Sequence, residues 1–112
     1  MADVFWPVGS GSSVALTADG AQAITINDQF IYVDGVTVSG TGNRTINLTI
    51  DSDVKLGAEV LVAVKTDGTE TTIFGTGIDS ATITGGAGKT KVQGFKYNGT
   101  VFLPVGTAQQ ID

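Results

Sequence analysis

The chain has 112 residues, of which 41% are hydrophobic and only 15% charged, and it contains 16 glycines, no histidine and no cysteine. This length supports one domain with one core. The net charge of −5, with the six basic residues scattered singly, excludes a surface that neutralises several phosphates of a nucleic acid, and the absence of cysteine excludes disulfides and thiolate metal sites.

The low charge content also bears on partners. Soluble domains usually carry about 25% charged residues, so we expect part of this surface to be covered by a partner or by other copies of the chain. No apolar stretch approaches the roughly 20 residues that span a bilayer, and residues 1–6 lack the basic region of a secretory signal. The sequence therefore predicts no membrane partner and a chain that is made and used without export.

Residues 1–13 are predicted to form an N-terminal arm, and residues 14–112 a single β domain. The arm contains the apolar residues Val4, Phe5, Trp6 and Val8, followed by Gly9–Ser13, which has the composition of a flexible linker. Exposed aromatic side chains on such a lead are costly in water. We expect them to dock either on the chain's own core or on a neighbouring subunit or larger surface.

Three Asx-Gly pairs interrupt runs of alternating apolar and polar residues. They are Asp34–Gly35, Asp67–Gly68 and Asn98–Gly99. Because such pairs tolerate the positive φ angles of a type I′ turn, each run is predicted to be a β-hairpin. Three hairpins leave little chain for a helix, a cofactor cradle or a catalytic loop.

The remaining strands support the same fold class. Thr45–Ile50 alternates as a half-exposed antiparallel strand should, with its isoleucines and leucine inward. Val60–Val64 is apolar throughout and is predicted to be a central strand, whereas Pro104 lacks a ladder donor and places its strand at an edge. The prediction is an all-β, antiparallel β-sandwich or small barrel built from hairpins, with no internal repeat.

Two segments imitate ligand-binding loops. Gly85–Thr90 ends like a phosphate-binding loop, but the position of the motif's first glycine holds Ile83 and a strand follows in place of a helix. Asp51 and Asp53 open like a calcium loop, but Lys55 and a late glycine break the pattern. We interpret both as plain connections and predict no cofactor and no metal.

Catalytic groups are sparse. General acid–base and nucleophilic catalysis draw on histidine, cysteine or paired carboxylates, and the acids Asp34, Asp67 and Asp79 sit singly in predicted turns and loops. The sequence therefore predicts a protein that is not an enzyme.

Six aromatic residues leave two interpretations open: Trp6, Tyr32, Phe74, Phe95, Tyr97 and Phe102. Most occupy strand positions opposite apolar residues, which favours the core or a contact between subunits. For the subunit interface the candidates are Phe30, Tyr32, Leu61 and Ala63, on two strands that are apolar on both faces. The alternative is a carbohydrate-binding, lectin-like module whose flat aromatic faces stack on sugars.

The C-terminal half, roughly residues 55–112, resembles a module of tailed-bacteriophage virion surface proteins, including capsid decoration and head fibre proteins. The resemblance lies in Phe95-Lys-Tyr-Asn-Gly-Thr-Val-Phe102, which follows a Gly-Lys strand at Gly88–Lys89. It implies a small β domain on a capsid, commonly trimeric, without catalytic residues.

Together these observations predict a non-enzymatic decoration or cementing protein of the phage head, made in the host cytoplasm and located on the virion. Its expected partners are the major capsid protein or other virion proteins, together with two sister subunits. The arm residues Val4, Phe5, Trp6 and Val8 are the candidates for contact with the shell.

Overall fold

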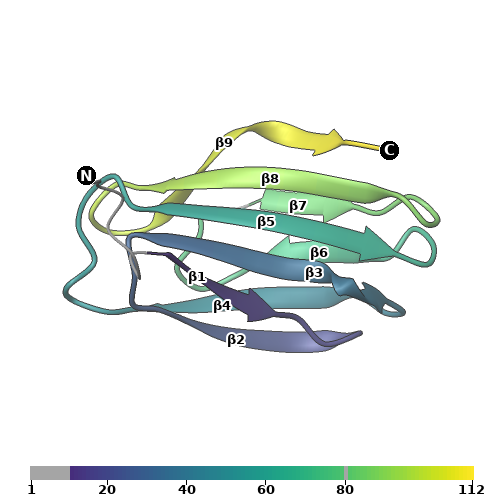
Figure 1. Cartoon of the computed structure of the whole chain (residues 1–112), viewed down its shortest axis with the longest axis horizontal. Helices are drawn as coiled ribbons and strands as arrows, with labels where there is room; N and C mark the ends of the chain where they lie inside the picture. Colours follow the sequence, from purple (N-terminus) through teal and green to yellow (C-terminus); the bar gives the residue numbers. More distant parts are fainter. Residues whose placement is uncertain (1–10, 80) are drawn as a thin grey trace, which may run out of the picture.

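The protein folds into two β-sheets packed face to face, as a computed structural model that describes residues 11–79 and 81–112 shows (Figure 1). The strands are β1 (Gly11–Ala15), β2 (Gly20–Ile26), β3 (Phe30–Gly40), β4 (Arg44–Ile50), β5 (Glu59–Thr66), β6 (Thr71–Phe74), β7 (Ala81–Thr84), β8 (Thr90–Tyr97) and β9 (Phe102–Gln110). One sheet has the order β1-β3-β5-β8-β9 and the other β2-β4-β6-β7. Within the described residues the two sheets do not close into a barrel, so the all-β sandwich is confirmed.

The first six strands alternate between the sheets. Each odd-numbered strand is followed by an even-numbered strand in the opposite sheet, and every pairing among these six is parallel. Antiparallel pairing begins only where β8 joins β5, β7 joins β6 and β9 joins β8. The predicted antiparallel sandwich is therefore wrong in its strand directions, because the chain winds from sheet to sheet before it turns back on itself.

Only one of the three Asx-Gly pairs closes a hairpin. Asn98–Gly99 connects the antiparallel strands β8 and β9, with the Asn98 side-chain oxygen accepting the amides of Thr100 and Val101 at 2.9 Å each. Gly99 has a φ of 96°, but Asn98 does not have a positive φ, so the turn is not the type I′ that the sequence predicts. This hairpin is confirmed and its turn type is corrected.

The other two predicted hairpins are wrong. Asp67–Gly68 connects β5 to β6, which belong to different sheets. Asp34–Gly35 lies inside β3, where the Asp34 carboxylate accepts the amides of Val36 and Thr37 at 2.9 and 3.0 Å and the Thr37 hydroxyl at 2.6 Å. The local carboxylate bonds bend the strand, and its register to β5 shifts between Gly35 and Gly40.

A fully buried arginine fills this bend. Arg44, on β4, donates from Nη1 to the Gly35 carbonyl at 3.2 Å and from Nη2 to the carbonyls of Val38 and Lys65 at 3.0 and 3.3 Å. Burial lowers the pKa of its guanidinium. A Cβ on Gly35 or Gly40 would lie 2.5 or 2.7 Å from this group, so both positions require glycine for space.

The core lies between the sheets and follows the predicted strand patterns. Ile46 and Leu48 of β4 point inward while Thr49 is exposed, and Phe74 packs edge-on against Phe95 across the two sheets, with ring centroids 4.8 Å apart. β5, which contains Val60–Val64, occupies the centre of its sheet, and the strand that holds Pro104 is an edge strand. These three strand predictions are confirmed, except that β4 is parallel to both neighbours.

Candidate functional site

The outer faces of the two sheets differ in chemistry. On the four-stranded sheet the outward positions of β2, β4 and β7 carry small or polar residues: Ala21, Ala23, Thr25, Thr45, Asn47, Thr49, Thr82 and Thr84. On the five-stranded sheet, in contrast, an uncharged row of register partners crosses every strand: Ser13, Tyr32, Leu61, Gly94 and Val105. Among the described residues, the outer face of the four-stranded sheet exposes one large apolar side chain, Ile73 of β6, whereas that of the five-stranded sheet exposes Phe30, Leu103 and Val105.

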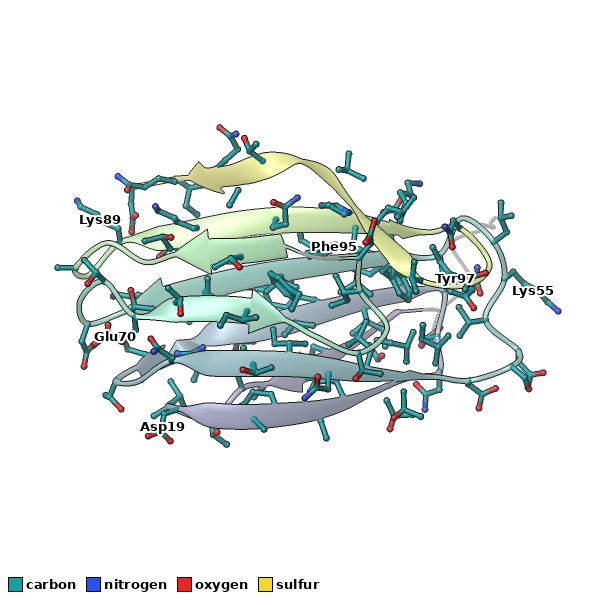
Figure 2. The ribbon with its side chains drawn as sticks, turned by 180° about the vertical axis from the view of Figure 1, so that it is seen from behind. Asp19, Lys55, Glu70, Lys89, Phe95 and Tyr97 are labelled. Atoms are coloured by element: carbon teal, nitrogen blue, oxygen red, sulfur yellow. The ribbon has the colours of Figure 1, made fainter. Side chains whose placement is uncertain are left out.

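Charged side chains gather mainly at the ends of the sandwich. Figure 2 shows Asp19, Glu70 and Lys89 at one end and Lys55 pointing away from the other, while Phe95 lies between the sheets. On the five-stranded sheet, the outward charged residues Asp34, Glu59 and Lys96 belong to the register rows on either side of the uncharged row.

A shallow hollow of about 260 Å³ lies on this outer face. The side chains and backbone around it come from four neighbouring strands: Phe30 of β3, Glu59 and Leu61 of β5, Gly94 and Lys96 of β8, and Val105 of β9. Phe30 is 40% exposed and Val105 57% exposed. The hollow is large enough for one aromatic ring, since an apolar cavity of about 150 Å³ already admits benzene.

Gly94 creates the hollow. It is paired with Leu61 on one side and Val105 on the other, and a Cβ built on it meets no heavy atom within 4 Å. Behind the face, the buried Gln93 amide donates to the carbonyls of Gly94 and Val105 at 3.0 and 3.1 Å. These bonds hold β8 and β9 together where their register shifts. They therefore fix the backbone of Gly94 beside Val105.

Opposite charges flank one end of the hollow. Lys96 donates to the Glu59 carboxylate at 2.6 Å, and both side chains are about half exposed. On the other side of the Tyr32–Leu61 pair, Asp34 is paired with Ala63. The hydrogen bonds that Thr37 donates to Asp34, above all the one from its hydroxyl, hold the pKa of Asp34 below its usual range. The hollow is thus an apolar patch with a polar rim, a combination that can bind an apolar group.

The candidate interface residues Phe30, Tyr32, Leu61 and Ala63 share this outer face. Phe30 and Leu61 line the hollow, Tyr32 is half-buried as the register partner of Leu61, and Ala63 is 4% exposed. The proposed shell-contact residues Val4, Phe5, Trp6 and Val8 lie outside the described residues. Of the predicted arm, Gly11–Ser13 forms the start of β1, paired with residues 30–32 of β3.

Gly94 and Val105 are missing from the sequence-based site. The available signal is a glycine in the interior of a strand, which marks a close approach or an empty position. Without the register between β5, β8 and β9, however, the sequence does not show that this glycine faces outward beside Leu61.

The two segments that imitate ligand-binding loops join successive strands, β7 to β8 and β4 to β5. Gly85–Lys89 leads directly into β8, with the Gly85 amide bound to the Glu70 carbonyl at 3.0 Å. The Asp51 carboxylate accepts the amide of Asp53 at 2.9 Å. In residues 11–79 and 81–112, no three acidic side chains gather to hold a metal ion, and the same residues include no helix that is long and apolar enough to cross a bilayer.

The aromatic residues that suggested sugar stacking are mostly internal. Phe74, Phe95 and Phe102 are at most 4% exposed. The half-buried Tyr97 stacks on Phe102 with ring centroids 4.9 Å apart, and its hydroxyl donates to the Gly99 carbonyl at 3.0 Å. Among the described aromatic residues, these four therefore stabilise the fold and do not form an open platform.

Comparison with known proteins gives no relative: no family model matches the chain, and neither a curated protein nor a solved structure is significantly similar to it.

Proposed function

We propose that this chain is a non-enzymatic structural protein of a tailed-phage virion that decorates or cements the capsid as a homotrimer. The observation that carries the proposal is the uncharged row Tyr32, Leu61, Gly94 and Val105 on the outer face of the five-stranded sheet. An apolar sheet face of this kind is stabilised when a protein surface covers it. The assignment to a phage particle rests on the resemblance carried by Phe95–Phe102.

Two surfaces divide the work in this proposal. The face that holds Phe30, Tyr32, Leu61 and Ala63 contacts sister subunits, and the arm residues Val4, Phe5, Trp6 and Val8 contact the shell. Three arms held in one trimer bind a repeating lattice far more tightly than a single arm, because after the first contact the others bind intramolecularly. Catalysis has no part in this scheme, since the hollow combines apolar side chains with one exposed ion pair.

The lectin-like alternative has less support. Tyr97 is engaged by Phe102 and by the Gly99 carbonyl within its own hairpin. A glycan array probed with the whole chain separates the alternatives: we expect no signal, whereas a signal that disappears in Tyr97→Ala favours the carbohydrate-binding module.

The direct test is the protein content of virions purified from the phage whose genome encodes the chain. Gel electrophoresis and mass spectrometry should find the chain in amounts comparable with the shell protein. The double variant Phe5→Ser, Trp6→Ser should lose binding to undecorated particles, while Thr49→Ser, an exposed change on the other sheet, should bind as well as the unmodified chain. Absence from the virion overturns the proposal, and unchanged binding of the double variant moves the shell contact away from the arm.

A further inference from the structure

The hollow over Gly94 lies at the end of the sheet where the described chain begins. Gly11, the first residue of β1, is the register partner of Phe30, and a Cβ on Gly11 would meet the Phe30 ring at 3.4 Å. Phe30 in turn lines the hollow. Figure 1 shows β1, β3 and β5 running in the same direction, so the starts of all three strands lie at this end.

The preceding residues have the chemistry of a ligand for such a hollow. Residues 4–8 read Val-Phe-Trp-Pro-Val, and Gly9 and Ser10 join them to β1. We propose that the indole ring of Trp6 docks in the hollow over Gly94 of its own chain, against Phe30, Leu61 and Val105.

The reach is sufficient. Trp6 precedes Gly11 by five residues, and an extended chain spans up to about 3.5 Å per residue, or about 17 Å in all. Neighbouring strands lie about 4.8 Å apart, and in the sheet order β5 is two strands from β1 and β8 three. The hollow between them is therefore about 10–14 Å from the point where the segment joins the sheet.

The path across the sheet is open. The outward positions of β1 hold Gly11, Ser13 and Ala15, which are small and exposed. A segment that folds back over β1 therefore meets no bulky side chain before it reaches Phe30. The short linker also favours the chain's own arm over the arm of a second copy. It gives the arm an effective concentration at the hollow in the millimolar range, which exceeds the concentration of a second copy in ordinary solution.

Docking on its own chain buries the apolar Trp6 side chain of the arm before the protein binds a capsid. This inference concerns the isolated chain and does not rest on the proposed function: absence from virions leaves it intact, and its own failure leaves capsid binding open.

Trp6 is the only tryptophan, so its fluorescence reports on the arm of the full chain without a label. We expect emission at shorter wavelength than that of the same chain in concentrated urea, and quenching by iodide that is severalfold weaker. Both properties should persist when dilution separates the trimer into single chains, because the docking is intramolecular.

Gly94→Leu fills the hollow and is the decisive variant. The position has open space and no positive φ, so the fold tolerates the side chain. Its Trp6 emission and iodide quenching should shift to those of the urea-unfolded chain. Thr49→Leu places the same side chain on the outer face of the other sheet and should leave both unchanged. If Gly94→Leu fails to fold by far-UV circular dichroism, Val105→Lys at the exposed rim serves instead, with the same expected release.

Three results would overturn the inference. Trp6 emission in the folded chain that equals the urea value shows an undocked arm. A shielded Trp6 that Gly94→Leu and Val105→Lys do not release shows docking elsewhere. Shielding that disappears on dilution together with a fall in molar mass shows that the occupant belongs to a second copy.

Discussion

The Arg44 guanidinium on β4 donates a hydrogen bond of 3.2 Å to the carbonyl oxygen of Gly35 on β3, and so connects the two sheets through a buried charge. Its other two bonds go to the carbonyls of Val38 and Lys65. All three acceptors are backbone groups, which remain in place whatever residue occupies position 44. Arg44 therefore supplies hydrogen-bond donors to backbone carbonyls at the bend of β3 and on neighbouring β5, and no carboxylate takes part in these bonds.

Replacing Arg44 by methionine should lower the free energy of unfolding by about 3 kcal/mol or more. Removal of the guanidinium leaves up to three carbonyls without a donor, and each buried unsatisfied group costs about 1–3 kcal/mol. Loss of the desolvation cost of the charge offsets part of this. Urea denaturation measures the change, with Lys55→Met, at an exposed loop position (Figure 2), as the control. A loss below about 1 kcal/mol for Arg44→Met would contradict this account of the bend.

Gly35→Ala should destabilise the fold by about 1–3 kcal/mol, because the new Cβ would lie 2.5 Å from Arg44 Nη1 and 2.9 Å from the Ala63 carbonyl oxygen. Gly86→Ala is the matched control: its Cβ makes only ordinary contacts with Lys89 and Gln110, at 3.6 Å or more, and the residue has no positive φ. We expect the control to be neutral or to stabilise by about 0.4–1 kcal/mol through the unfolded chain. Thermal unfolding of the two variants tests this order, and the reverse order would contradict it.

Acid should weaken the fold partly through Asp34. Its folded-state pKa lies below the ordinary value of 3.8 because Thr37 and the amide of Val36 donate to its carboxylate. A depressed folded pKa gives stability that is complete above the unfolded pKa and lost as pH falls through the folded one. Asp34→Asn should therefore flatten the dependence of the unfolding free energy on pH below about 4. Asp53→Asn controls for loss of one loop charge, and an Asp34→Asn profile parallel to the unmodified one would show that these bonds do not contribute.

Local sequence signals predicted single strands well. Each successful prediction rests on the residues of a single strand: which of its faces are buried, and which of its amides can join the ladder. The examples are the alternation in Thr45–Ile50, the continuous apolar run Val60–Val64 and the missing amide of Pro104. The same holds for Asn98–Gly99, whose side-chain oxygen caps its own turn.

Strand directions depend on partners that are distant in the sequence. Asp34–Gly35 looks like a hairpin turn, but its glycine is needed because Arg44 approaches it, and this contact exists only after β3 and β4 have entered different sheets. The winding also leaves no regular sequence period: the register partners Gly11, Phe30 and Glu59 are separated by 19 residues (11 to 30) and then by 29 (30 to 59). The alternation of strands between the two sheets therefore repeats in the structure, but its two successive segments, 11 to 30 and 30 to 59, differ in length and give no repeat in the sequence.

The candidate surface was predictable in part for the same reason. Phe30, Tyr32, Leu61 and Ala63 stand out as large or apolar residues on strands without a polar face. Gly94 carries no side chain, so its role follows only from the register that places it between Leu61 and Val105.

The molar mass of the purified chain, measured by light scattering at micromolar concentration, tests most directly whether the outer face of the five-stranded sheet is a subunit contact. We predict about three times the chain mass of 11.4 kDa. Phe30→Arg, which places a charge at an exposed position of that face, should give one chain mass, and Thr49→Arg on the other sheet should remain a trimer. A monomeric unmodified chain, or a trimer that Phe30→Arg leaves intact, would contradict the account.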